Sequence, residues 1–193
     1  MAILKRKEAD RFTYADYLTW PDEERWELIN GEAYNMSPVP GKRHQQILVE
    51  LMGAFWSHLK GKPCQVFAAP FDVRPLATSE MSDDEVDTVV QPDLLVVCDK
   101  NKLEERGVVG APDLVVEILS PYTSRKDLSK KFDLYERAGV REYWVVYPME
   151  KIIHIYRLED GRYGKPYSAA SGKTIEVPWL DDFRLDVAAV FAE

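Results

Sequence analysis

The stretch PDLVVEILS at residues 112–120 sets one glutamate, Glu117, inside an otherwise apolar run. The run is rich in valine and leucine, begins at a proline and is too short for a helix, which is typical of a strand buried on both faces. Earlier in the chain, QPDLLVVCD at 91–99 repeats the pattern, so a Pro-Asp pair opens two successive apolar runs. We therefore predict two buried strands that bring carboxylates to one place.

The two acidic residues of the first stretch cannot share a metal ion. At ~3.3 Å per residue, Asp113 and Glu117 lie ~13 Å apart on one strand face, whereas the ligands of one Mg²⁺ lie ~2.1 Å from it. We interpret Asp113 as a strand-entry residue that bonds a nearby backbone N–H. Glu117 needs a partner on a neighbouring strand, ~5 Å away. Asp93, which opens the other run, is the natural candidate, although a strand-entry role is open to it as well.

Glu117 also needs a counter-charge, because an unpaired buried carboxylate costs several kcal/mol. A helix predicted over 124–139 supplies a candidate. With Leu128 set at 0° and ~100° per residue, Lys131 lies at ~300°, in the centre of the apolar stripe, and Lys130 at ~200°, at its polar edge. Lys131 is therefore expected to point at the sheet. Snorkelling along the core edge, or a salt bridge to Glu117 without catalytic function, would explain it too.

The remaining patterns predict a single α/β domain of mixed, α+β character. No repeat of fixed period and no linker divides 1–193, which we separate into an N-terminal helix and hairpin at 10–40, a core at about 43–158 and C-terminal strands with a helical turn at 159–193. The acidic stretch 77–87 is typical of a mobile, solvated loop. The predicted elements are a helix at 13–20 with a Thr13/Asp16 capping box, a hairpin turning at Asn30-Gly31, a helix at 44–59, strands at 64–75, 91–99 and 112–120, the helix at 124–139, strands at 142–147 and 151–158, and a tail of one or two short strands and a helical turn capped by Asp186.

Charge and cysteine content limit the classes of function. The chain has 25 Lys+Arg and 33 Asp+Glu, a formal net charge of −8, which argues against a non-specific nucleic-acid coat protein but not against a nuclease with an acidic metal site. Cys64 and Cys98 are too few and too far apart for a zinc cluster, and we expect both to be reduced core thiols. No apolar run approaches ~18 residues and no secretion signal is visible. We expect a soluble, cytoplasmic protein without membrane contact.

The order of helix, three strands, helix and strand, with an aspartate opening the second strand and a glutamate inside the third, resembles the PD-(D/E)XK nuclease superfamily. More closely, the chain is similar to a widespread bacterial family of restriction endonuclease-like proteins. The likeness runs from about residue 10 to 190 and is carried by ELINGEAYNMSP, GKRHQQI, QPDLLVV and GAPDLVVEILSPYTSRKDLSKKFDLYERAGVREYWVVYP. It implies a restriction endonuclease-like fold, with a central mixed sheet flanked by helices.

The resemblance also implies roles for individual residues. Asp93 matches the superfamily aspartate, and Glu117 matches the acidic member of the (D/E)XK triplet. The triplet here reads Glu117, Ile118, Leu119 and lacks the lysine. The matching lysine is displaced to the following helix as Lys131, the residue that helical spacing selects on its own.

Four further residues are candidates. Glu32, after the hairpin glycine, matches an acidic position of the family and would be a catalytic residue, as a further ligand or a water-orienting group, unless it is only a solvated hairpin residue. His44, at a helix start, suits capping or a phosphate contact as well as catalysis. Arg125 and Lys126 are candidates for contacts with the nucleic-acid backbone, or are solvated helix charges.

These residues predict a metal-dependent endonuclease that hydrolyses phosphodiester bonds, with DNA as the expected substrate. Asp93, Glu117 and the Ile118 backbone carbonyl would hold one or two Mg²⁺, for which Mn²⁺ would substitute. Lys131 would orient the attacking water or contact the scissile phosphate. A homodimer would present two sites to two strands. The alternative is a catalytically inactive nuclease-fold domain that binds nucleic acid or a partner protein, and a plain structural α/β protein is a third reading.

Overall fold

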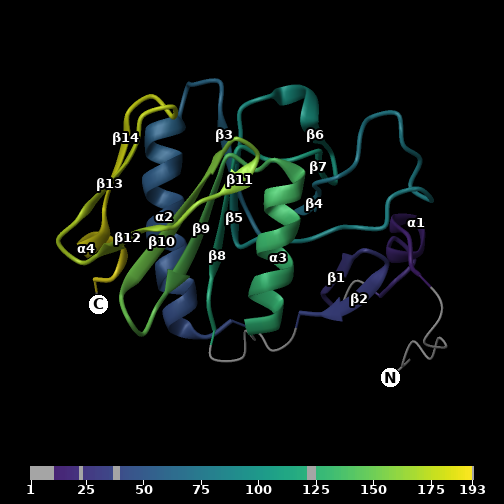
Figure 1. The fold of residues 1–193 in the computed structure, drawn as a ribbon, viewed down its shortest axis with the longest axis horizontal. Coiled ribbons are helices and arrows are strands. Elements are labelled where there is room, and N and C mark those ends of the chain that lie inside the picture. The colour runs from purple at the N-terminus through teal and green to yellow at the C-terminus, as the bar shows by residue number, and fades with distance from the viewer. Residues whose placement is uncertain (1–10, 22–23, 37–39, 121–124, 193) are drawn as a thin grey trace.

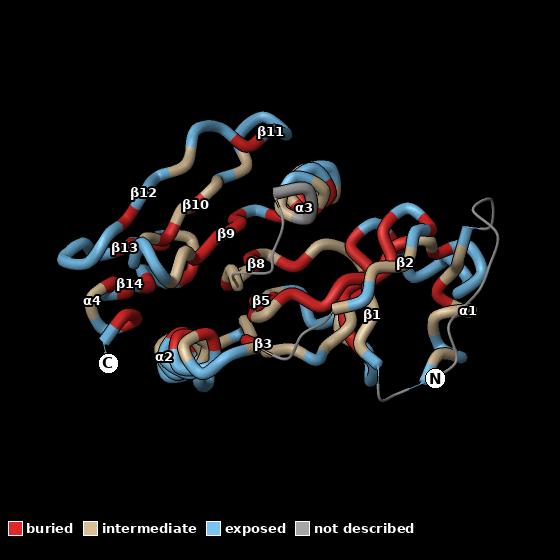
Figure 2. The backbone as a smooth tube through the Cα atoms, turned by 90° about the horizontal axis from the view of Figure 1, so that it is seen from below, coloured by how far each residue is buried: buried red, intermediate tan, exposed pale blue. Residues whose placement is uncertain are grey.

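A mixed sheet between two helices forms the centre of the protein, in a computed structural model that describes residues 11–21, 24–36, 40–120 and 125–192, without the side chains of 125–127. The strands follow the order β11-β10-β9-β8-β5-β3, and β12 also pairs with β10. Helices α2 (Lys42–Leu59) and α3 (Arg125–Ala138) cover opposite faces (Figures 1 and 2). This confirms the predicted fold class. The strands are β3 (Gln65–Ala68), β5 (Leu94–Val97), β8 (Leu114–Ile118), β9 (Glu142–Tyr147), β10 (Ile152–Glu159), β11 (Arg162–Tyr163) and β12 (Tyr167–Ala170).

The side chains of β8 alternate between two apolar clusters. Leu114, Val116 and Ile118 belong to the cluster that contains the buried face of α2. Val115 belongs to the cluster that contains the buried face of α3. Because a strand directs successive side chains to opposite faces, Glu117 lies on the α3 side of the sheet.

Strand β5 is the antiparallel neighbour of β8. Leu94 lies opposite Val116, and continuing this register by one residue places Asp93 opposite Glu117. Directly opposed residues of an antiparallel pair share a sheet face. The neighbouring-strand partner that spacing predicted for Glu117 is therefore across from it, at the point where β8 ends and β5 begins.

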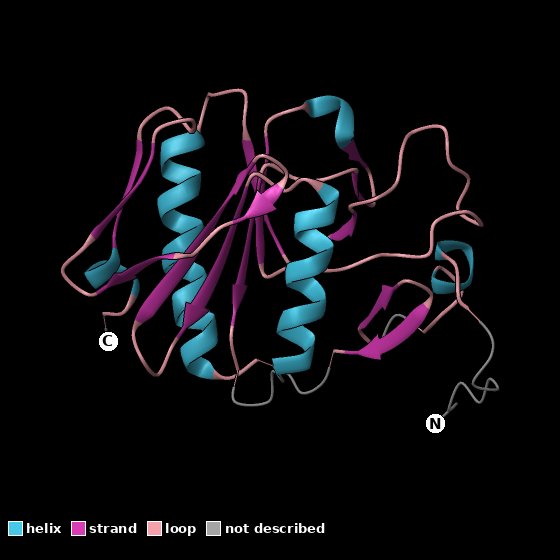
Figure 3. Cartoon of the chain, in the orientation of Figure 1, coloured by secondary structure: helices cyan, strands magenta, loops and turns pink. Residues whose placement is uncertain are grey.

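A group of short elements lies beside the sheet, as Figure 3 shows. Helix α1 (Tyr14–Tyr17) has the predicted capping box, and the hairpin of β1 (Trp26–Ile29) and β2 (Glu32–Asn35) turns at Asn30 and Gly31, which have φ of 50° and 77°. A bridge between Leu28 and Val89 joins the hairpin to the chain before β5. The other elements are β4 (Asp72–Arg74), a 3-10 turn at Lys100–Lys102, β6 (Leu103–Glu104), β7 (Gly107–Val109), β13 (Thr174–Val177), β14 (Phe183–Asp186) and α4 (Val187–Val190), which Asp186 caps as predicted.

Three predicted segments differ in the structure. The strand predicted at 64–75 is two strands, β3 and β4, which belong to different sheets because Pro70 interrupts the run. The acidic stretch 77–87 is held against α1, since Tyr14 N donates to Val86 O at 2.7 Å and Val86 is buried. The tail carries the four strands from β11 to β14. None of the helices among the described residues has the length and apolar character needed to cross a bilayer.

The prediction that both cysteines are reduced is wrong in this structure, because Cys64 and Cys98 form a disulfide. Strands β3 and β5 are antiparallel, with Gln65 opposite Val97. The next pair outward in that register is Cys64 and Cys98. The pairing could not be seen from the spacing of the cysteines along the chain, since it depends on which strands are neighbours and in what register.

Reduction of the Cys64–Cys98 bond is expected to lower the free energy of unfolding by about 2–4 kcal/mol. The bond joins residues 34 positions apart, and its loss gives the unfolded chain more conformations. Urea denaturation with and without a reductant measures the change. The double variant Cys64→Ser/Cys98→Ser is the control, and its stability should not respond to the reductant. A wild type that is equally insensitive would contradict the prediction.

Candidate active site

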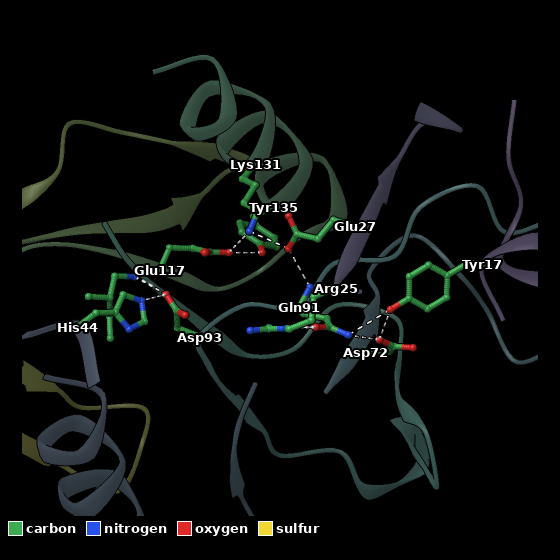
Figure 4. A network of polar contacts seen from close by, with 11 residues as sticks. Tyr17, Arg25, Glu27, His44, Asp72, Gln91, Asp93, Glu117, Lys131 and Tyr135 are labelled. Atoms are coloured by element: carbon green, nitrogen blue, oxygen red, sulfur yellow. Dashed lines mark hydrogen bonds and ion pairs between the residues drawn. The ribbon is translucent and has the colours of Figure 1, made fainter. Parts of the chain in front are cut away.

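Glu117 is fixed by two donors from α3. Its Oε1 atom accepts hydrogen bonds from Lys131 Nζ and from Tyr135 OH, each at 2.8 Å. The two donors are four residues apart, so they lie on the same face of the helix, and Figure 4 shows both converging on Glu117. The side chain of Glu117 is only 12% exposed. Helical spacing predicted correctly that Lys131 points at the sheet.

Lys131 bridges two carboxylates. Besides Glu117, its Nζ atom lies 2.8 Å from Oε1 of Glu27, on β1. Glu27 is buried, and the same oxygen accepts from the Gln91 backbone N–H at 2.9 Å. Burial alone would lower the pKa of Lys131, but the Glu117 and Glu27 carboxylates raise it above its ordinary value. Lys131 therefore carries a positive charge throughout the neutral pH range.

The pKa of Glu117 is raised to about 7. Burial is the largest cause, Lys131 opposes it, and the charges of Asp93 and Glu27 raise the pKa further. Two carboxylates thus share the positive charge of Lys131, and a third, Asp93, lies close enough to raise the pKa of Glu117 in a region with little exposure to solvent. Such a surplus of negative charge favours the binding of a cation.

Asp93 is held at one of its oxygens. Oδ2 accepts from the Ile118 backbone N–H at 2.7 Å and lies 3.2 Å from Nε2 of His44, in the first turn of α2. The Nδ1 atom of His44 is buried and has no hydrogen-bond partner within the described part of the chain. His44 thus orients Asp93, a role that the residue pattern did not separate from capping.

The donor atoms at this place fit Mg²⁺. Asp93 Oδ1 and Glu117 Oε2 have no hydrogen-bond partner among the described residues. The N–H and C=O groups of one strand residue point to the same neighbouring strand, so the Ile118 carbonyl is directed toward the Asp93 side as its N–H is. No three His, Cys, Asp or Glu side chains of the described ranges gather closely enough to hold a metal by themselves. Mg²⁺ suits such a set, since it is bound by one or two carboxylates and retains several waters.

Not every predicted site residue joins this group. Glu32, on β2, is 70% exposed and pairs with Lys130 at 3.1 Å, and it also contacts the Tyr34 hydroxyl. Its catalytic role stays a prediction. Arg125 and Lys126 begin α3, but their side chains lie outside the described part of the chain, and so does any contact with a nucleic-acid backbone.

Asp113 has the structural role that its position predicted. Its Oδ2 atom accepts from the Cys98 backbone N–H at 2.8 Å. This bond joins the start of β8 to the end of β5. The two Pro-Asp pairs therefore have related functions, because each aspartate bonds a backbone N–H of the opposite strand.

Sequence reasoning missed Glu27 and Tyr135. Alternation in β1 assigns Trp26 and Leu28 to the buried face and turns Glu27 to solvent. In the structure both faces of the hairpin are covered, because Leu28 and Ile29 belong to different apolar clusters. Tyr135 did have a signal, since its hydroxyl lies in the apolar stripe one turn after Lys131.

Polar contacts continue from Glu27 away from the sheet (Figure 4). The Gln91 side chain accepts from Arg25 at 3.0 Å, and its Nε2 donates to Asp72 at 2.9 Å and to the Tyr17 hydroxyl at 3.1 Å. These bonds tie the hairpin and α1 to the segment that enters β5. Glu27 therefore approaches the site from a part of the fold that is itself fixed.

The protein has a mixed sheet covered by one helix on each face, an aspartate just before one central strand, a glutamate on the next strand and a lysine from the following helix that pairs with this glutamate. These features define a restriction endonuclease-like protein. Comparison with known proteins identifies the family. The model of the Uma2 family, described as "putative restriction endonuclease", matches residues 14–188. The chain belongs to this family.

Two similar proteins are consistent with this assignment. An uncharacterized protein of Synechocystis sp., slr1290, is 29% identical over 148 residues, which are 75% of this chain and 73% of that protein. The crystal structure of a putative nuclease of DUF820 from Anabaena variabilis superposes with a TM-score of 0.71 at 22% identity. That match covers 93% of this chain and 97% of the other, and it shows that the two proteins share a fold.

Proposed function

We propose that the protein is a metal-dependent endonuclease that hydrolyses phosphodiester bonds in DNA. Membership of a family of putative restriction endonucleases supports a nuclease-like function. The observation that supports the specific reaction is that Glu117 pairs with Lys131 and lies close enough to Asp93 for the charge of Asp93 to raise its pKa. Asp93 and Glu117 each keep one oxygen without a partner among the described residues, and the buried Lys131 ammonium lies 2.8 Å from the other oxygen of Glu117.

Different residues of the site would have different roles in such a reaction. Asp93 and Glu117, with the Ile118 carbonyl, would hold Mg²⁺ or Mn²⁺. When bound, the ion supplies a water of lowered pKa and stabilises the charge that develops on the phosphate. His44 and Tyr135 orient the two carboxylates through Oδ2 and Oε1.

Lys131 contributes positive charge that needs no metal. Because its pKa is raised, it stays protonated at the pH at which Glu117 ionises. It would contact the scissile phosphate or orient the attacking water, where a preorganised charge lowers the barrier most. The proposal also includes a homodimer, which would place two such sites on two strands. It further includes contacts from Arg125 and Lys126 to the nucleic-acid backbone and a cytoplasmic location.

Cleavage and thermal stability test this function together. We expect the purified protein to cut plasmid, linear or single-stranded DNA in Mg²⁺ or Mn²⁺ and to leave it intact in a chelator. The same ions should raise the melting temperature, because a ligand at 100 times its Kd stabilises the folded state by about 3 kcal/mol. If every form of DNA stays intact and neither ion raises the melting temperature, the nuclease proposal fails. A catalytically inactive binding domain would then remain.

A further inference from the structure

Lys131 lies between two carboxylates that come from different parts of the fold. Its Nζ atom is 2.8 Å from Glu117 on β8 and equally 2.8 Å from Glu27 on β1. The side chains of Glu27 and Glu117 are 7% and 12% exposed. The ammonium is therefore shared between the central sheet and the hairpin.

Binding of a divalent cation at Glu117 would disturb this arrangement. The cation and the Lys131 ammonium repel each other when both contact the same carboxylate, and the repulsion is strong where solvent is scarce. A buried ammonium without a counter-charge is strongly destabilising. Among the described residues, Glu27 is the other carboxylate in ion-pair contact with Lys131, so it is the group that would keep the ammonium paired.

Glu27 is placed for this task by contacts that do not involve Glu117. Its Oε1 accepts from the Gln91 N–H at 2.9 Å, and the Gln91 side chain is bonded in turn to Arg25 and Asp72. The position of Glu27 thus does not depend on whether Glu117 holds the lysine or a metal. A second contact between the hairpin and α3, from Glu32 to Lys130, lies at the surface, where such pairs contribute little to stability.

We propose that Glu27 is a positioning residue of the active site, which holds the Lys131 ammonium in place when a divalent cation occupies Glu117. The proposal rests on the proposed function, because it requires a metal at Glu117. With Glu27 neutral, Lys131 would pair with Glu117 alone and would compete with the metal for that carboxylate. Metal affinity should then fall, although neither proposed side-chain ligand has been changed.

The test compares the Mn²⁺ concentration that gives half of the maximal thermal stabilisation. Glu27→Gln removes the charge but keeps an oxygen that can accept from Gln91 N–H, and we expect it to raise this midpoint about 10- to 100-fold. Glu27→Asp keeps the charge and should fall between this variant and the wild type. Glu142→Gln is the matched control, because Glu142 is a buried carboxylate bonded to Trp144, Arg157 and Trp179 instead. Its midpoint should equal that of the wild type.

A second measurement separates this role from a merely structural one. NMR with and without Mg²⁺ measures how fast the ¹⁵N-labelled Lys131 ammonium exchanges its hydrogens with solvent. In the wild type we expect slow exchange in both conditions, and in Glu27→Gln fast exchange once Mg²⁺ is added. A raised midpoint with unchanged exchange overturns the proposal, because Glu27 would then act on the metal directly. An unchanged midpoint, or an equal rise in Glu142→Gln, overturns it too.

Failure of the proposed function gives a different result. If neither Mn²⁺ nor Mg²⁺ raises the thermal stability of the wild type, the metal site is wrong and the role of Glu27 fails with it. If the wild type is stabilised by the ions and the Glu27 variants do not behave as expected, only the role of Glu27 is wrong. If Glu27→Gln does not fold, the proposal is tested with Glu27→Asp instead. Its shorter side chain should still raise the midpoint, and an unchanged midpoint would overturn the proposal.

Discussion

Lys131→Met is expected to abolish metal-dependent cleavage and to lower the free energy of unfolding of the metal-free protein by about 3–5 kcal/mol. The buried ammonium is paired with Glu27 and Glu117 at 2.8 Å each. Without it, two buried carboxylates lose their counter-charge, and the site loses the positive charge proposed to act on the phosphate. Urea denaturation and a plasmid cleavage assay measure the two effects separately.

The neighbouring lysine provides the control for this prediction. Lys130 pairs with the exposed Glu32, so Lys130→Met should cost no more than about 1 kcal/mol and should retain cleavage. Mn²⁺ should restore part of the stability that Lys131→Met loses, because it replaces a missing positive charge. An unchanged cleavage rate in Lys131→Met would refute its catalytic role, and an unchanged stability would refute the buried ion pairs.

Glu117→Gln is expected to remove the stabilisation by metal ions and to become more stable relative to the wild type as the pH rises. The pKa of Glu117 is about 7 in the folded protein, against an ordinary value of 4.5. Between these values the folded wild type binds more protons than the unfolded chain, so its stability falls as the pH increases. At about 1.4 kcal/mol per pKa unit, the fall amounts to at most about 3 kcal/mol. The variant lacks this titration.

Denaturation of both proteins in a chelator at pH 5 and pH 8 measures the effect of Glu117. The difference in stability between the variant and the wild type at pH 5 is the control, because the carboxyl of Glu117 in the folded wild type is also neutral at that pH. A difference in stability that is the same at both pH values would show that Glu117 does not titrate in this window. A variant that still gains thermal stability from Mn²⁺ would show that Glu117 is not a ligand.

Local spacing was sufficient to predict the centre of the candidate site. The strand rise separated Asp113 from Glu117 and required a partner on the next strand, and the β5–β8 register, continued by one residue, places Asp93 opposite Glu117. The helical period selected Lys131 over Lys130, and the structure pairs the first with buried carboxylates and the second with an exposed one. Both predictions depended on periodicities of the backbone, which hold wherever a strand or helix forms.

Contacts between distant segments could not be predicted in this way. Alternation along its strand gives no reason to expect Glu27 to be buried, and the packing of apolar residues on both sides of the hairpin buries it. The pairing of Cys64 with Cys98 required the neighbours and register of β3 and β5. The overall fold was predicted mainly from the resemblance to a known family, since the topology of the sheet follows from no local pattern.

The disulfide bears on the candidate site from the far end of β5, which starts after Asp93 and ends before Cys98. Side chains alternate along a strand, so a slip of β5 by one residue would turn Asp93 to the α2 face, away from Glu117. The covalent link between Cys64 and Cys98 prevents β5 from sliding along β3. An oxidised protein thus has the register of β5 against β3 fixed by a covalent bond, whereas the register of β5 against β8, which sets the carboxylate pair, relies on the strand pairing and on the hydrogen bonds that Ile118 N–H donates to Asp93 and Cys98 N–H donates to Asp113.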